Sequence, residues 1–264
     1  MIPDEDQRRR RVGAALLTAV GLFAVIGPWL VAADPIAQDL AKTLEPPGSD
    51  FLLGTDHLGR SVLARLAHAT RLSVGLGLLT VFTAAAPGIL LGLAAAWYGG
   101  WLDRLLGVVC EAVMALPPLL LVVLFVALAP GEFAPLYLGL ALSLWVEYFR
   151  VVRTTAARRL AQSDVEASRL LGMPPSYIVR RHLVPDLAQP VLTLMAFGLA
   201  TTIVAISALS YISVGLRPPR AEWGSMMTEL MPFYAEASVQ LVMPAILLAA
   251  TVLGLNLIAG RSLK

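Results

Sequence analysis

The sequence holds a single cysteine, Cys110, and few charged residues. One cysteine excludes an intrachain disulfide and any metal site built from several thiolates. A buried apolar role is the ordinary one for such a residue. Charged residues make up 14% of the chain, whereas a soluble domain carries about 25%. With 264 residues, 58% of them hydrophobic, and a mean hydropathy of +0.75, the chain is predicted to lie in a lipid bilayer.

The sequence also lacks the patterns that catalysis or nucleotide binding would need. It contains no glycine-rich phosphate-binding loop and no arrangement of nucleophile and base that points to an enzyme. The three histidines cannot form one metal site, because His57 and His68 fall in one expected loop and His182 falls in another on the opposite side of the bilayer. We therefore expect a non-catalytic membrane subunit that binds no metal, no cofactor and no nucleic acid.

Six apolar runs are candidates to cross the bilayer, for which a helix needs about 20 apolar residues. They cover residues 12–33, 73–97, 105–129, 135–149, 190–214 and 237–259. The pattern predicts an all-α, polytopic membrane protein with six transmembrane helices. Residues 1–70 would hold an N-terminal tail, the first helix and an external segment. Residues 71–264 would hold the other five helices and a long polar loop at about 153–189.

The positions of lysine and arginine predict the orientation, because these residues favour the cytoplasmic side. If the N-terminus lies inside, 14 of the 20 basic residues fall in inner segments and 6 in outer segments. This bias favours both termini in the cytoplasm. It also places the polar loop between the fourth and fifth helices in the cytoplasm.

That loop contains the stretch "EASRLLGMPPSYIVRRHLVP" at residues 166–185. Asp164 is predicted to cap a short helix that runs to Leu171. Gly172 then stands where the end of a helix favours a left-handed residue. The two prolines that follow prevent continuation and allow a second short helix to begin, which Pro185 is expected to end. These residues alone leave two interpretations open: a solvated anchor for the flanking helices, or a docking element for a partner protein.

The stretch resembles the Glu-Ala-Ala loop of the permeases of ATP-binding-cassette (ABC) importers. Two positions depart from that pattern: Ser168 replaces the second alanine, and Asp186 replaces the usual asparagine. The resemblance implies a coupling helix that fits into a groove on a separate ATPase. It also implies that two partner ATPase subunits, rather than this chain, bind ATP and Mg. The positions that would form the ATPase-coupling loop are Glu166, Ala167, Ser168, Gly172, Ile178, His182 and Pro185.

Three further stretches, residues 52–75, 97–121 and 210–227, resemble the permeases of peptide, nickel and opine importers. This resemblance implies a type I importer fold in the bacterial cytoplasmic membrane. It also implies a heterodimer with a homologous permease, served by an extracytoplasmic substrate-binding protein. The chain is most similar to the second, C-type permease of a dipeptide or nickel system. The substrate stays open between di- or oligopeptides, nickel and metal–opine chelates, and "GTDHLGRS" is nearer to the nickel and metallophore members.

Carboxylates within spans are costly and often mark a pathway or an interface. Glu111 falls about one and a half turns into the third apolar run, and Glu147 falls near the inner end of the fourth. Each is a candidate pathway or interface residue, and pairing with Arg150 is the structural alternative for Glu147. Met226 and Met227 form a soft cluster near the outer face, for which helix packing is the alternative.

The main alternative function is an ion-coupled secondary transporter. Such proteins are built from inverted repeats and place ion-coupling groups near the middle of the membrane. The sequence shows no convincing internal repeat, and only Glu111 would serve as a coupling carboxylate. These observations favour the importer permease.

Overall fold

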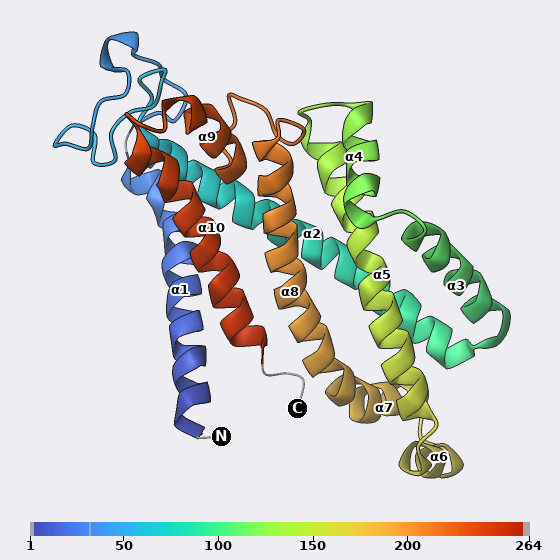
Figure 1. The fold of residues 1–264 in the computed structure, drawn as a ribbon. Coiled ribbons are helices and arrows are strands. Elements are labelled where there is room, and N and C mark those ends of the chain that lie inside the picture. The colour runs from blue at the N-terminus through green and yellow to red at the C-terminus, as the bar shows by residue number, and fades with distance from the viewer. Residues whose placement is uncertain (1–2, 32, 261–264) are drawn as a thin grey trace.

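The computed structural model describes residues 3–31 and 33–260, and helices make up most of it (Figure 1). A π-helical turn at Val179–Leu183 joins α7 to α8, and short 3-10 turns lie at Leu40–Lys42 and Met231–Phe233. The α-helices are α1 (Pro3–Leu30), α2 (Val62–Tyr98), α3 (Gly100–Met114), α4 (Pro118–Leu128), α5 (Phe133–Leu160), α6 (Ser163–Leu170), α7 (Pro175–Ile178), α8 (Val184–Tyr211), α9 (Trp223–Leu230) and α10 (Ser238–Ala259).

Five helical segments within the described residues are long and apolar enough to cross a membrane. A sixth span results if α3 and α4 are taken together. The all-α, multi-span class predicted from the sequence is therefore confirmed. The five segments are Gln7–Leu30, Val62–Tyr98, Phe133–Leu160, Pro175–Tyr211 and Ser238–Ala259.

The third predicted span, residues 105–129, is not one helix. The chain bends by 78° between α3 and α4. Pro117 adopts an extended conformation, with φ −55° and ψ 136°, and neither Pro117 nor Pro118 has an N–H to continue the hydrogen-bond ladder of α3. The span is thus divided into an oblique helix and a short second helix.

Two other predicted boundaries are wrong for a shared reason. The fourth span was expected to end at 149, but α5 continues to Leu160 through four arginines. Arginine ends an apolar run but is a good helix former. Pro185 was expected to end the helix that begins at Pro175, yet it lies in the first turn of α8, which continues to Tyr211. Proline is tolerated in a first turn because the N–H that it lacks has no intrahelical partner there.

The helices form one sloping bundle (Figure 1). α2 crosses behind α8 and α5 and packs along α5, while α1 packs along α10. Glycines allow the closest of these approaches: a Cβ on Gly88 would lie 2.6 Å from the carbonyl oxygen of Trp145, and one on Gly92 would lie 2.7 Å from that of Phe149. Small residues at such contacts let membrane helices pack backbone to backbone.

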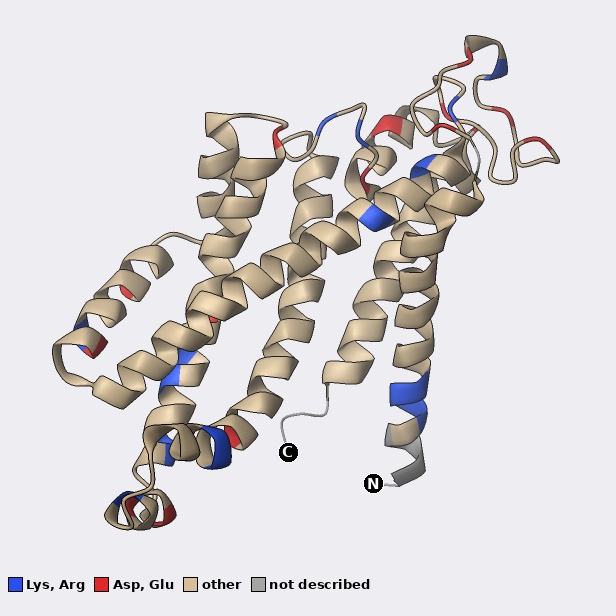
Figure 2. Cartoon of the chain, turned by 180° about the vertical axis from the view of Figure 1, so that it is seen from behind, with Lys and Arg blue, Asp and Glu red and all other residues tan. Residues whose placement is uncertain are grey.

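The molecule has two polar ends. The α9 end holds the segment 33–60 and α9, whereas the α6 end holds α6, α7 and the first turns of α1 (Figure 1). Figure 2 shows most of the lysine, arginine, aspartate and glutamate near these two ends, with few charges between them. This distribution is the one expected of helices that cross a bilayer. Arg261 and Lys264, which entered the orientation count, lie outside the described residues.

Candidate functional site

The α6 helix projects beyond the ends of α5 and α8 (Figure 1). Its surface exposes Glu166 and Ala167. Two leucines at its end are far more exposed than a packed leucine: Leu170 is 83% exposed and Leu171 is 76% exposed. Neither was singled out from the sequence, because a leucine in a short helix normally indicates packing. Neighbouring exposed apolar side chains at a polar end are typical of a surface that contacts another protein.

Gly172 ends α6 in the left-handed conformation, with φ +74°. This confirms the backbone conformation predicted for it. Its N–H donates to the carbonyl oxygen of Arg169 at 3.0 Å, and the N–H of Met173 donates to the carbonyl oxygen of Ser168 at 3.1 Å. These bonds satisfy carbonyl groups at the end of the helix. A Cβ added at Gly172 would meet no atom of this chain within 4 Å. Within the chain, the glycine is therefore required by its φ value and not by crowding.

The start of α6 differs from the prediction. Gln162 holds the N-cap position, and its side chain makes no capping bond. Asp164 lies in the first turn, where its carboxylate accepts two hydrogen bonds from the Arg159 guanidinium, at 2.6 and 2.7 Å. The same guanidinium lowers the pKa of Asp164 from 3.8 to about 2. Asp164 thus fastens α6 to the last turn of α5 instead of capping it.

Arg159 connects three helices at this end. Its Nε lies 2.8 Å from the carboxylate of Asp186 in α8, and its Nη2 lies 3.2 Å from Nδ1 of His182. His182 also places Nε2 3.0 Å from the hydroxyl of Ser168. The two departures from the family pattern, Ser168 and Asp186, therefore belong to one polar network that holds α6 against α5 and α8.

The predicted loop residues consequently divide into two groups. Ile178 is buried, at 2% exposure, and Ser168 and His182 face each other, so these three hold the loop in place. The remaining residues of the group face outward: Glu166, Ala167, Gly172 and Pro185.

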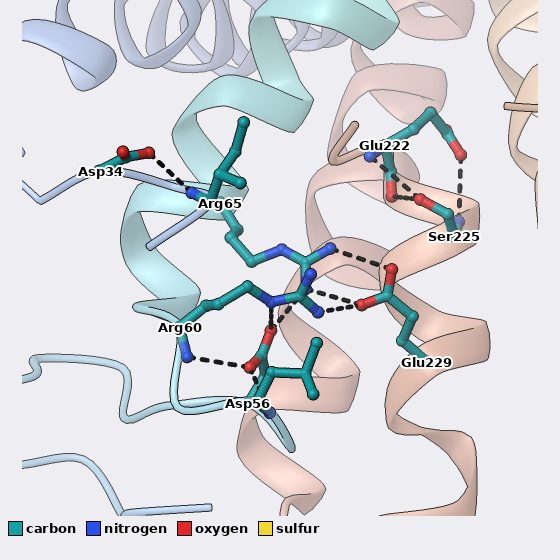
Figure 3. A network of polar contacts seen from close by, with 9 residues as sticks. Asp34, Asp56, Arg60, Arg65, Glu222, Ser225 and Glu229 are labelled. Atoms are coloured by element: carbon teal, nitrogen blue, oxygen red, sulfur yellow. Dashed lines mark hydrogen bonds and ion pairs between the residues drawn. The ribbon is translucent and has the colours of Figure 1, made fainter. Parts of the chain in front are cut away.

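The α9 end contains a buried four-residue ion-pair network (Figure 3). Arg60 Nε lies 2.6 Å from the carboxylate of Asp56. Arg65 binds Glu229 through two N–H groups, at 2.7 and 3.1 Å, and also contacts Asp56; Arg60 contacts Glu229 as well. Two positive charges thus balance two negative ones and join the outer segment to α2 and α9. None of the four was singled out, because the charges are brought together from distant parts of the sequence.

The environment of these carboxylates keeps them ionised. Burial raises the pKa of Asp56, but hydrogen bonds from the Arg60 N–H and the Arg65 guanidinium outweigh it, so that the pKa lies below its ordinary value. Burial likewise raises the pKa of Glu229, and Arg65 and Arg60 lower it below the ordinary value. The network is therefore a set of ion pairs at neutral pH.

A third buried carboxylate anchors the start of α9. Glu222 accepts hydrogen bonds from the hydroxyl of Ser207 at 2.7 Å and from the N–H of Gly224 at 2.7 Å. It also accepts bonds from Ser73 of α2 and from the N–H of Ser225. Burial raises the pKa of Glu222 above its ordinary value. This residue links α2, α8 and α9 (Figure 3 shows its contacts with Ser225).

Asp56, His57 and Glu229 bring potential metal-ligand atoms within 4.8 Å of one another. Both carboxylates are already bound by arginines, however, and the His57 ring stacks on Phe233 with centroids 5.5 Å apart. Two guanidinium groups beside the carboxylates oppose a further cation. The arrangement therefore fits a structural anchor better than a metal site, and His57 gives no support to nickel binding.

A cavity of about 540 Å³ lies between α4, α5, α8 and α10. Glu147 lines it from the midpoint of α5, which continues through four arginines beyond the apolar run whose inner end it was predicted to mark. The alternative pairing with Arg150 is not found: Arg150 contacts the sulfur of Met114 at 3.3 Å. Within the described residues, the carboxylate of Glu147 has no hydrogen-bond or ion-pair partner.

Glu111 lies elsewhere. It lines a cavity of about 420 Å³ between α3 and α5, together with Arg150 and Arg153. The structure therefore does not bring the two candidate carboxylates together. Met226 is buried in the α9 end at 2% exposure, packed in a cluster with Val62 and Trp223. This burial favours the packing alternative for Met226, whereas Met227 is half-buried.

The chain is similar to proteins that are all described as membrane components of transport systems. The family described as "Binding-protein-dependent transport system inner membrane component" matches residues 88–264. A protein of Brucella suis, described as a peptide transport system permease, is 33% identical over 95% of this chain and 85% of its own length. The dipeptide transport system permease protein DppC of Haemophilus influenzae is 27% identical over 96% of this chain and 88% of its own. The di/tripeptide transport system permease protein DppC of Pseudomonas aeruginosa is 30% identical over 93% of this chain and 83% of its own length.

Proposed function

Because the chain belongs to the family of binding-protein-dependent transport system inner membrane components, as a permease of an ABC importer, we propose that its cargo is di- or oligopeptides. The names of the relatives support this choice, since all three similar proteins compared above are peptide permeases. Nickel, which the sequence left open, gains no such support, and His57 is stacked on Phe233 beside carboxylates that arginines occupy. In this proposal the chain forms one half of a membrane pathway and a homologous permease forms the other.

The observation that carries the coupling role is the surface of α6. Leu170 and Leu171 are exposed at a polar end of the molecule, and the Arg159 network holds the helix that presents them. A rigid projecting element can transmit motion, whereas a mobile loop would absorb it. The proposed partner at this surface is an ATPase subunit, two of which would bind ATP and Mg. A substrate-binding protein would deliver the peptide at the α9 end.

The two polar ends also indicate where the protein lies. The protein would lie in the cytoplasmic membrane of a bacterium, with its α6 end in the cytoplasm and its α9 end outside. The start of α1 lies toward the α6 end, and the C-terminal end of α10 points the same way (Figure 1). This arrangement agrees with the predicted orientation, in which both termini are cytoplasmic and the excess of arginine and lysine is on the inner side.

Uptake by a strain that lacks this chain tests the substrate. A deletion strain and its complemented counterpart would be given a radiolabelled dipeptide and, separately, labelled nickel. The proposal predicts that complementation restores dipeptide uptake and leaves nickel uptake unchanged. Restoration of nickel uptake alone would contradict it.

A further inference from the structure

The cavity of Glu147 has a chemistry that suits one kind of ligand. Of the described residues that line it, Glu147 alone carries a charge. The remaining lining is apolar apart from a few hydroxyl groups and the amide of Asn256. A charge within a membrane-spanning helix is costly, and such groups face a partner charge or a pathway. No described residue pairs with Glu147, and its side chain is exposed in the single chain, so its carboxylate is available to a ligand that enters this cavity.

The neutral polar groups of the cavity present acceptors. The Ser143 hydroxyl donates to the carbonyl oxygen of Gly139 at 2.9 Å. The Thr201 hydroxyl donates to the carbonyl oxygen of Gly198 at 3.1 Å. A hydroxyl has one hydrogen and two lone pairs, so these groups, with their hydrogens already used within their own helices, keep an oxygen that can accept.

Asn256 adds to the same pattern. Its amide nitrogen donates one hydrogen to the carbonyl oxygen of Val252 at 2.9 Å, so the side-chain oxygen can accept and the second amide hydrogen can still donate. A cavity with one carboxylate and several acceptor oxygens is matched by a ligand that carries several donors and a positive charge. An ammonium group has three N–H donors and no acceptor.

We propose that Glu147 receives the ammonium group of a peptide as the peptide passes through the membrane. This inference rests on the proposed function and specifies how the cargo is recognised inside the permease. The cavity volume of about 540 Å³ lies within the range of about 300–1,000 Å³ typical of small-ligand sites. A carboxylate at the midpoint of α5 offsets the cost of moving an ammonium group away from water.

Uptake of radiolabelled dialanine tests this role. The measurement uses proteoliposomes that contain this chain with its partner permease, the ATPases and the binding protein. Glu147→Gln should lower the maximal uptake rate about tenfold or more, which is the size expected for loss of one charge-assisted hydrogen bond. The half-saturation concentration should stay unchanged, because the binding protein captures the peptide first. Glu147→Asp should retain most of the uptake, as should the control Glu132→Gln, an exposed position at the start of the same helix.

A chemical variant separates charge from shape. Cys110 is the only cysteine of the chain, so Cys110→Ala provides a background for Glu147→Cys. Sulfonatoethyl methanethiosulfonate, which adds a negative charge, should restore uptake in the double variant. Trimethylammonioethyl methanethiosulfonate, which adds a positive charge, should not. The Cys110→Ala complex treated with each reagent controls for cysteines of the partner proteins.

Three results would overturn the inference while leaving the proposed function intact. They are wild-type uptake by Glu147→Gln, equal restoration by both reagents, and loss of the partner permease from the purified Glu147→Gln complex, which would make Glu147 an interchain ion-pair residue. Failure of the wild-type complex to import dialanine or longer peptides would instead overturn the proposed function, and this inference with it.

Discussion

At the scale of single residues, Arg65 shows how a charge stabilises an apolar protein. It is 2% exposed and binds both Asp56 and Glu229, so it compensates two carboxylates that burial would otherwise disfavour. Removing one member of a buried ion pair costs about 3–5 kcal/mol because the other is left uncompensated. The stability of the α9 end therefore depends on this side chain more than on any surface charge.

We expect Arg65→Ala to destabilise the protein by about 3–5 kcal/mol. Arg71→Ala, at an exposed position of the same helix, serves as the matched control and should change stability by less than about 0.5 kcal/mol. Thermal unfolding of the two variants in detergent measures the difference. Equal stability of both variants would show that the network does not anchor the outer segment.

The same network predicts a dependence on pH. The folded pKa values of Asp56 and Glu229 are lowered from 3.8 and 4.5, so the unfolded chain binds protons more readily. The stabilisation is therefore complete above the unfolded values and is lost as the pH falls through the folded ones. Asp56→Asn should be less stable than wild type at neutral pH, and the gap in melting temperature should narrow as the pH falls below about 4. A difference in melting temperature that stays constant with pH would contradict the assignment of Asp56 to a buried ion pair.

At the scale of elements, α6 and its bend form the part of the molecule that is built to contact a partner. Asp164 and Asp186 both bind Arg159, which orients α6 relative to α5 and α8. Gly172 then turns the chain at φ +74°. The outward surface is left to Glu166, Leu170 and neighbouring residues, whose side chains take no part in holding the loop.

Leu170→Ser should therefore weaken ATPase binding without unfolding the chain. Leu170 is 83% exposed, so its loss removes apolar area from a contact and leaves no cavity within this protein. If the leucine is fully buried by the partner, the loss is about 1.5–3 kcal/mol, or roughly tenfold to a hundredfold in affinity. Co-purification of ATPase subunits measures it. Leu40→Ser, at a 69% exposed position of the outer segment, is the control, and equal ATPase retention by the two variants would remove α6 from the interface.

The sequence predicted which helices exist better than it predicted where they begin and end. Apolar runs located the membrane helices, and glycine followed by two prolines located the bend after α6. Hydropathy could not show that α5 continues through Arg150 and Arg153, because helix formation does not require apolar residues. It also could not place the start of α2 at Val62, since Arg65 is accommodated only by carboxylates distant in sequence.

The candidate site was predicted unevenly for the same reason. Motif spacing identified Gly172 and its conformation from local chemistry. Glu147 was predicted from its place near the end of an apolar run, whereas the cavity that it lines is formed by four helices and could not be predicted from that run. The ion pairs of Arg60 and Arg65 depend on tertiary contacts with α9, which no local pattern indicates.

At the scale of the whole molecule, the two polar ends predict opposite sides of a membrane. A reporter that is active only in the cytoplasm should be active when fused after Arg181, at the α6 end. It should be silent when fused after Gly48 or Pro219, at the α9 end. Activity at Gly48 would reverse the orientation inferred from the distribution of basic residues.

The proposed importer requires ATP hydrolysis by partner subunits, whereas the alternative secondary transporter requires an ion gradient. Reconstitution of this chain with its partner permease, ATPases and binding protein distinguishes the two most directly. The measurement is uptake of a radiolabelled dipeptide into proteoliposomes, with and without enclosed ATP and in the presence of a protonophore. We predict uptake that depends on ATP and on the ATPases and is unchanged by the protonophore. Uptake that proceeds without ATP and collapses with the ion gradient would contradict the proposal.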